Sequence, residues 1–338
     1  MRFAMPGFLA DVIDRSSSLF GRPFDPGTSL APPHGKYGTV HYGVMIPGLP
    51  EPYRFVNVIA LIGQPKARLF ANPHLVRTSP EDTANLLVGT ATATPDHFRG
   101  YSVAAECDFQ ADGSRLRFGQ DLTIVGKHPN FTLCREGHRF NLELTLTASD
   151  KVAHFARLAG GLYDHWSVLC QYRGQLELEG RKTDIGGLCT FEYARAAKVN
   201  LPFRFFTYQI INIDSCTQVL LTEVLGPLGL EAQRRVYVRG LNDHGAVYGR
   251  GFDFTVQEFE STVSITPNGH SMRLPKIFSW RVEDENGEEV IAIEGQSNGD
   301  FNYGMTAGYA GSYQYRGCFR GRPVEGTGYI EYIDLRGQ

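Results

Sequence analysis

An internal repeat constrains the fold of this chain more than any other feature. Three segments of the middle of the chain return in the same order near the C-terminus: 172–174 (YRG), 180–181 (GR) and 187–193 match 315–317, 321–322 and 326–332. A long repeat of this kind predicts two homologous halves, each ending in the same hairpin. The last strand of each hairpin carries one carboxylate, Glu192 or Glu331. The alternative is chance recurrence in a chain with 38 glycines.

Apolar residues alternate with polar ones along several segments, which is the pattern of strands with one buried face. The clearest segments are 139–147 (RFNLELTLT) and 175–179 (QLELE). Asp112-Gly113 and Asn286-Gly287 are typical hairpin turns. These turns separate expected strands at 101–109 and 114–125, and at 277–283 and 288–293. The chain is therefore predicted to be an all-β protein built from antiparallel hairpins.

The N-terminal segment has a different pattern. Phe8, Leu9, Val12 and Ile13 have helical spacing, and a Ser-, Pro- and Gly-rich stretch follows as far as Pro33. We expect residues 1–36 to form a short helix and a linker. With the repeat, this predicts a first barrel at 37–197 and a second at 198–338.

Composition narrows the classes of partner. The net charge is −3 and neither sign forms a long run, which argues against nucleic acid or an anionic membrane. No segment reaches the 18 apolar residues of a membrane span, and the N-terminus lacks a signal-peptide cleavage site. The six cysteines are scattered, so we expect a cytoplasmic protein with free thiols. The oligomeric state is left open.

The motifs of common cofactors are missing from the sequence. There is no glycine-rich phosphate loop and no nucleophile elbow. The Asp-His dipeptides at 96–97, 164–165 and 243–244 do not have metal-ligand spacing, because adjacent residues of a strand face opposite ways. The prediction is therefore no cofactor and no metal.

Four segments give the chain a resemblance to a known family. The two hairpin ends, the His41-Tyr42 strand start and the aromatic strand 203–209 resemble the carotenoid hydratase/AttH-like proteins. That resemblance implies two lipocalin-like β-barrels in tandem. The chain departs from the family at 190–193, which reads TFEY and keeps a carboxylate but lacks the neighbouring histidine, and at 163–167, which reads YDHWS.

The resemblance also implies a class of activity, because the family includes hydratases of isolated double bonds and pericyclic cyclases. We expect a lyase or isomerase that acts on a hydrophobic, terpenoid-like molecule by acid-catalysed hydration, dehydration, isomerisation or cyclisation of a C=C bond. The same fold suits a non-catalytic carrier of a lipid or isoprenoid equally well, and a structural protein with filled barrels is the third possibility.

Protonation of an alkene carbon needs a positioned acid beside aromatic surface. In a strand, Asp164 and Trp166 share one face and Tyr163 and His165 share the other. We expect Asp164 to be the acid, next to Trp166 in a pocket, with Tyr163 and His165 also in contact with substrate. The alternative is a turn in which Asp164 caps a backbone amide and Trp166 fills the core.

Other candidates come from the repeat and from aromatic strands. Glu192 is the second candidate acid and His41 a candidate base, while Glu331 is expected to be structural. A repeated Glu can instead pair with Arg173 or Arg316, and His41 can be satisfied locally. Further expected substrate contacts are Tyr42, Phe206, Tyr303 and Tyr309. The last two belong to a Tyr- and Gly-rich stretch at 302–315 that can equally be ordinary barrel lining.

Overall fold

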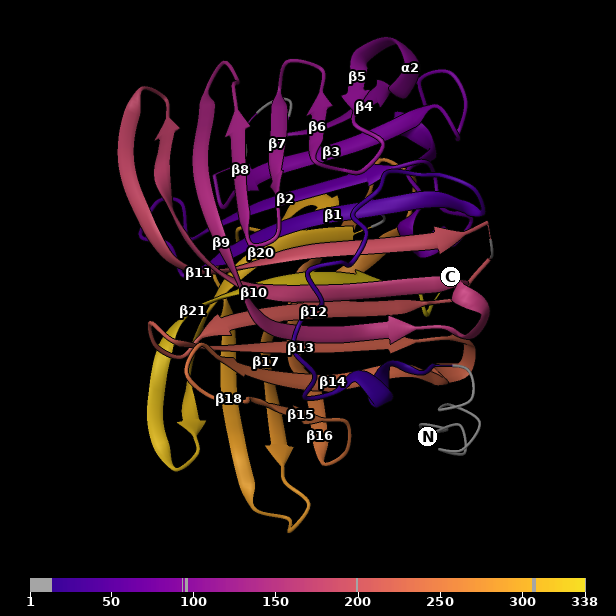
Figure 1. Cartoon of the computed structure of the whole chain (residues 1–338). Helices are drawn as coiled ribbons and strands as arrows, with labels where there is room; N and C mark the ends of the chain where they lie inside the picture. The colour runs from indigo at the N-terminus through magenta and orange to yellow at the C-terminus, as the bar shows by residue number, and fades with distance from the viewer. Residues whose placement is uncertain (1–13, 93, 95–96, 199, 306–307, 338) are drawn as a thin grey trace.

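The computed structural model describes residues 14–92, 94, 97–198, 200–305 and 308–337. Two large antiparallel sheets make up nearly all of it (Figure 1). The first is an eleven-stranded, nearly closed sheet in the order β4-β3-β2-β1-β11-β10-β9-β8-β7-β6-β5. The second is ten-stranded, in the order β15-β14-β13-β12-β21-β20-β18-β17-β16, with β19 paired to β20. The all-β, double-barrel prediction is confirmed.

The first sheet holds all strands up to Ala197. Its strands are β1 (Tyr37–Pro47), β2 (Phe55–Ile62), β3 (Thr83–Thr90), β4 (Phe98–Ser102), β5 (Cys107–Phe109), β6 (Arg115–Phe118), β7 (Leu122–Lys127), β8 (Asn130–Arg135), β9 (Phe140–Arg157), β10 (Tyr163–Leu178) and β11 (Arg181–Ala197). The helix α2 (Val103–Glu106) and the 3-10 helices Ser16–Leu19, Arg68–Phe70, Pro73–Leu75 and Ala159–Gly161 accompany them.

The second sheet begins at Phe205. Its strands are β12 (Phe205–Asn212), β13 (Thr217–Leu225), β14 (Glu231–Gly240), β15 (Ala246–Tyr248), β16 (Phe252–Ile265), β17 (Ser271–Glu283), β18 (Glu289–Ser297), β19 (Asn302–Met305), β20 (Gly308–Phe319) and β21 (Arg322–Asp334), with a 3-10 turn at Pro227–Gly229. The expected helix through Phe8 and Ile13 lies outside the described residues.

The sequence pattern explains the strands well. In β9 the buried Leu142, Leu144 and Leu146 alternate with exposed residues, so one face of the strand packs into the barrel. Gly113 and Gly287 have φ of +75° and +79°, as their turns require.

Two expected strands are broken, and these predictions were wrong. The segment 101–109 is interrupted by α2, where the Ser102 hydroxyl accepts from the backbone N–H of Ala105 and so starts a helical turn. The segment 114–125 turns at Gly119, whose φ is +53°. In both cases a local turn overrides the alternation of apolar residues.

The two halves have the same local order of strands. The hairpin β10–β11 lies beside β1, and the hairpin β20–β21 lies beside β12. In this register Glu192 pairs with Gly43, and Glu331 pairs with Tyr208. The repeated glutamates therefore stand on the strands that meet the opposite barrel.

The barrels are joined by polar contacts as well as by apolar packing. The Arg235 guanidinium donates to the carbonyl of Phe155 at 2.9 Å, and the Tyr237 hydroxyl donates to the carbonyl of His154 at 2.8 Å. Arg54 of the first barrel pairs with Asp300 of the second at 3.2 Å. Strand β14 thus lies along β9, and β1 lies against β12 and β21.

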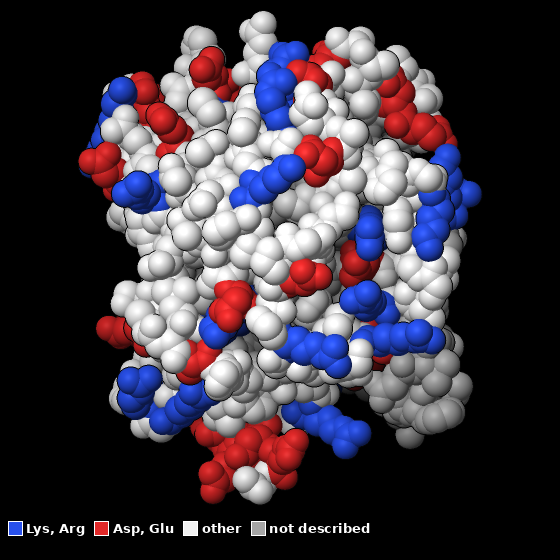
Figure 2. Space-filling view, viewed as in Figure 1, with Lys and Arg blue, Asp and Glu red and all other residues white. Residues whose placement is uncertain are grey.

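The surface carries both signs of charge. Figure 2 shows Lys and Arg interspersed with Asp and Glu on one face, with acidic side chains gathered at the lower tip, where Figure 1 places the turn between β17 and β18. Among the described residues, no helix combines the length and apolar character that crossing a membrane requires.

Candidate functional site

A large cavity lies where the two barrels meet. Its volume is about 850 Å³, and its lining is predominantly apolar. It is bounded by residues of β1, β2, β9, β10 and β11 on one side and of β12, β13, β14 and β21 on the other. This volume is within the usual range of small-molecule sites.

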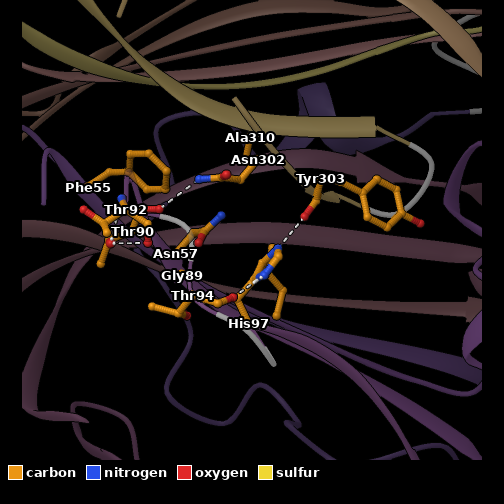
Figure 3. Close-up of a pocket in the computed structure, with 11 residues that line it drawn as sticks. Phe55, Asn57, Gly89, Thr90, Thr92, Thr94, His97, Asn302, Tyr303 and Ala310 are labelled. Atoms are coloured by element: carbon orange, nitrogen blue, oxygen red, sulfur yellow. Dashed lines mark hydrogen bonds between the residues drawn. The ribbon is translucent and has the colours of Figure 1, made fainter. Parts of the chain in front are cut away.

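A second, much smaller pocket lies at the edge of the same interface (Figure 3). It measures about 10 Å³, roughly the space of one water molecule. The His97 ring closes it: Nδ1 bonds the carbonyl of Thr94 at 2.9 Å, and Nε2 bonds the carbonyl of Tyr303 at 2.7 Å. The large cavity is therefore the candidate site.

Two histidines stand side by side on the cavity wall because of the register of three strands. His41 of β1 and His165 of β10 both pair with Ala194 of β11, one from each side. All three line the cavity. Since Ala194 has a single methyl group, the two imidazole rings approach each other across it, with centroids 5.9 Å apart.

Glu192 lies two residues before Ala194 on the same face of β11. Its cross-strand neighbours are Gly43 and Ser167, both small. A Cβ at Gly43 would lie 2.9 Å from Nε2 of His41, so the glycine makes room for that ring. Oε2 of Glu192 lies 3.7 Å from Nε2 of His165 and 4.0 Å from Nε2 of His41.

His41, His165 and Glu192 each make a further hydrogen bond through their other polar side-chain atom. Nδ1 of His41 bonds the carbonyl of Ala60 at 3.2 Å, and Nδ1 of His165 bonds the Tyr163 hydroxyl at 3.0 Å. Oε1 of Glu192 accepts a hydrogen bond from the Tyr208 hydroxyl at 2.5 Å. Tyr208 belongs to the second barrel, so the site is assembled across the interface.

The second barrel adds its own carboxylate to the cavity wall. Glu331 is 1% exposed and lines the cavity next to its sheet partner Tyr208. Its Oε1 accepts from the Tyr329 hydroxyl at 2.8 Å, and that hydroxyl accepts from the Asn57 amide at 3.0 Å. Both repeated glutamates therefore face one cavity.

The two carboxyl groups have opposite pKa shifts. Burial raises the pKa of Glu331 well above its usual range, and the charge of Glu192 raises it further. Burial also raises the pKa of Glu192, but its neighbours His165 and His41 lower it more, and the net shift is downward. Burial lowers the pKa of His165. The site thus favours a protonated Glu331 beside an ionised Glu192.

One buried cation lies behind this wall. Arg239 of β14 donates to the carbonyl of Ser167 at 2.8 Å and to the amide oxygen of Gln218 at 2.5 Å. Burial lowers the pKa of Arg239, while the charge of Glu192 opposes that shift. The arginine therefore adds positive potential near Glu192, and its bond to the Ser167 carbonyl joins the two barrels.

The structure separates the candidates of the YDHW segment. Tyr163 and His165 line the cavity, together with Glu192, His41 and Phe206. Asp164 and Trp166 are on the opposite face of β10, and their expected position in the pocket is wrong. Asp164 pairs with Arg195 at 3.3 Å, and Trp166 is buried in the first barrel against Phe24 and Tyr193.

The remaining predicted substrate contacts lie away from the large cavity. Tyr42 is in the core of the first barrel, where its hydroxyl donates to the carbonyl of Leu30 at 2.5 Å. Tyr303 borders the small pocket, and the Tyr309 ring packs against Tyr303. The family resemblance suggested that Tyr42 contacts the substrate. In β1, however, it is the adjacent His41 whose side chain faces the cavity.

Sequence reasoning missed Tyr208, and it assigned Glu331 to structure. The alternation of Phe206 and Tyr208 in the aromatic strand 203–209 is a signal that could have placed both on one face. The alternative, in which the repeated glutamates pair with Arg173 or Arg316, is not seen among the described residues: Glu192 contacts the two histidines, and Arg316 pairs with Glu294.

One family of known sequences matches most of this chain. The model of a family described as "Family of unknown function (DUF6670)" matches residues 59–338. The chain belongs to this family. No curated protein matches it.

Solved structures show that the fold of this DUF6670 member is shared more widely. An AttH protein of Nitrosomonas europaea is 12% identical, with a TM-score of 0.63 over 93% of this chain and 99% of its own. CghA is 8% identical, with a TM-score of 0.56 over 94% and 98%. Kievitone hydratase of Nectria haematococca is 14% identical, with a TM-score of 0.50 over 93% and 98%. The resemblance seen in the sequence is thus confirmed for the fold.

Proposed function

We propose that this protein is a lyase or isomerase that binds a hydrophobic, terpenoid-like molecule between its barrels and protonates a C=C bond of it. The observation that carries the proposal is the meeting of two buried carboxyl groups, Glu192 and Glu331, on the wall of one large apolar cavity. The fold is shared with a protein named as a hydratase, which supports the same class of reaction by analogy.

The two glutamates take different roles in this proposal. Glu331, kept protonated by its surroundings, gives its proton to one alkene carbon and leaves a cation on the other. The rings of Phe155 and Phe206 on the cavity wall stabilise that cation. For hydration, water adds to the cation and Glu192 takes the proton that the water loses. For isomerisation or cyclisation, Glu192 takes a proton from a neighbouring carbon instead.

The next turnover requires a proton to return from Glu192 to Glu331. Solvent that enters the open cavity carries it, because the Tyr208 hydroxyl bonds Glu192 and no hydrogen bond among the described residues joins that hydroxyl to Glu331. Reversal of the same steps is dehydration. The reaction class therefore needs only the side chains of this wall and a substrate that fills the cavity.

The proposal is tested by following the transferred proton. With a convertible ligand in D₂O, the wild-type protein is expected to place deuterium on carbon, because the Glu331 proton exchanges with solvent. Glu331→Gln has nearly the same size but no acidic proton, and should slow incorporation by about 10²–10⁴-fold. Asp164→Asn, which changes the acid first expected from the sequence, is the matched control and should keep the wild-type rate.

Each other outcome has a clear meaning. Loss of deuterium transfer in Asp164→Asn but not in Glu331→Gln returns the acid role to Asp164. A ligand that binds tightly and gains no deuterium in the wild-type protein supports the second candidate function, a carrier of a lipid or isoprenoid, which the large apolar cavity accommodates equally well.

A further inference from the structure

His41, His165 and Glu192 bring their potential ligand atoms close together at the cavity wall. One ligand atom from each side chain lies within 4.8 Å of the other two. Around a tetrahedral zinc ion with bonds of about 2.0–2.2 Å, ligand atoms stand roughly 3.4 Å apart. The separations of 3.7 and 4.0 Å from Glu192 Oε2 to the two Nε2 atoms would shorten by about 0.3 and 0.6 Å, and the two imidazole rings, with ligand atoms within the 4.8 Å bound, would also move closer together.

The hydrogen bonds of the two Nδ1 atoms indicate which nitrogen of each imidazole carries the hydrogen. The carbonyl oxygen of Ala60 can only accept, so Nδ1 of His41 is the donor and carries the hydrogen. In the neutral ring, Nε2 of His41 then points a lone pair, and no hydrogen, toward Glu192. The Tyr163 hydroxyl can take the same role for Nδ1 of His165. Nε2 of His165 is buried and has no hydrogen-bond partner among the described residues.

Such an arrangement calls for a cation. Two imidazole lone pairs and a carboxylate oxygen repel one another unless a positive charge lies between them, supplied either by a proton on one imidazole or by a metal ion. In metal sites, a ligating histidine bonds a carbonyl or similar group through its other nitrogen, and a ligating carboxylate accepts a further hydrogen bond. All three side chains here have that second partner: Ala60, Tyr163 and Tyr208.

We propose that His41, His165 and Glu192 form a binding site for a divalent transition-metal ion, with Zn²⁺ as the expected ion. Two histidines and one carboxylate with an open fourth position are a ligand set of catalytic zinc sites. All three residues line the cavity, so the open position faces the space that a substrate would fill. This site was not expected from the sequence, because its ligands come from β1, β10 and β11 and share no local spacing.

The binding itself is independent of the proposed function, but its consequence for catalysis rests on it. An ion at this position would lower the pKa of a bound water and would thereby replace Glu192 in activating water for hydration. Glu331, on the other barrel, would keep its role as the acid.

The test is metal binding by untagged protein that has first been stripped with a chelator. Titration calorimetry is expected to show about one Zn²⁺ per chain, and Co²⁺ should give the visible absorption bands of a low-coordinate, nitrogen-liganded ion. His41→Ala, His165→Ala and Glu192→Gln should each weaken binding by about 100-fold or more, and Tyr208→Phe, behind the carboxylate, by about 10–100-fold. His244→Ala, which removes an exposed imidazole elsewhere, is the control and should bind like wild type.

Two results would overturn the metal site. One is a wild-type protein that is folded by circular dichroism and binds neither Zn²⁺ nor Fe²⁺. The other is binding that the three ligand substitutions leave as strong as the His244→Ala control, which would place the ion elsewhere. If a ligand variant fails to fold, Tyr208→Phe still decides, because it keeps all three ligands and should weaken Zn²⁺ binding while the His244→Ala control does not. If the protein binds no metal at this site but deuterium transfer still depends on Glu331, the metal site is refuted and the proposed function is not.

Discussion

The hydroxyl of Tyr208 donates a hydrogen bond of 2.5 Å to Oε1 of Glu192, and the two residues belong to different barrels. Both are buried, at 2% exposure each. A charge-assisted bond in such a place is stronger than a neutral one, and removing the Tyr208 hydroxyl takes this hydrogen bond away from a buried carboxylate oxygen. The contact therefore links the geometry of the site to the docking of the barrels.

Tyr208→Phe should lower the free energy of unfolding by about 1.5–3 kcal/mol, because it removes a hydrogen bond to a charged group. Urea denaturation measures this. Tyr237→Phe is the matched control: its hydroxyl also crosses the interface but donates to a neutral carbonyl, that of His154. It should cost about 0.5–1.5 kcal/mol. Equal losses in the two variants would mean that Glu192 carries no charge at this contact.

Gly43→Ala should disturb the site while leaving the fold nearly unchanged. The new methyl group would stand 2.9 Å from Nε2 of His41 and 3.2 Å from the Met45 methyl. Because both are ends of movable side chains, the backbone need not shift, but the His41 ring must turn away from Glu192. We expect deuterium transfer and Zn²⁺ affinity to fall by about 10-fold or more, as for lost support of a site residue.

The control for that substitution is Gly249→Ala, whose methyl group would meet nothing closer than the Arg235 side chain at 4.0 Å. Melting temperatures should be similar for both variants. If Gly43→Ala leaves both activity and metal affinity at the wild-type level, the position of the His41 ring does not matter for the site.

Stability should fall in mild acid because of His154. Burial lowers the pKa of this histidine to about 4, against an ordinary value of 6.5. Between these values the unfolded chain binds more protons than the folded one, so the free energy of unfolding decreases as the pH falls from 6.5 toward 4. The slope from this one group is at most about 1.4 kcal/mol per pH unit, and less because the ring is partly exposed.

Denaturant unfolding of His154→Gln at several pH values checks this expectation, since the variant should show a shallower fall in acid. His244→Gln, at an exposed position, should keep the wild-type slope. A variant His154→Gln with an unchanged pH profile would show that another group is responsible for the acid sensitivity.

The sequence predicted those parts of the structure that local pattern controls. Alternation such as that of Leu142, Leu144 and Leu146 requires a strand with one buried face, and the repeated hairpins around Glu192 and Glu331 place the same unit in both halves. The opposite facing of Asp164 and His165 also follows from the period of two.

Other parts depend on contacts that no local pattern encodes. Alternation shows that Asp164 and His165 lie on opposite faces, but the face that meets the second barrel is decided by how the two sheets dock. His41 and His165 are 124 positions apart in the chain and meet only because both strands flank Ala194. Tyr208 reaches Glu192 from a different sheet, so its role required the three-dimensional structure.

The central claim is that the cavity between the barrels holds a hydrophobic small molecule beside Glu192 and Glu331. Native mass spectrometry of the protein purified from its own host tests it most directly, together with Ala156→Trp, which fills part of the cavity, and Ala104→Trp, which adds the same group on the exposed helix α2. We predict that an apolar ligand accompanies the wild-type and Ala104→Trp proteins and is lost from Ala156→Trp. A ligand retained equally by both variants, or a wild-type protein that binds no apolar molecule even when terpenoids are supplied, would contradict the account.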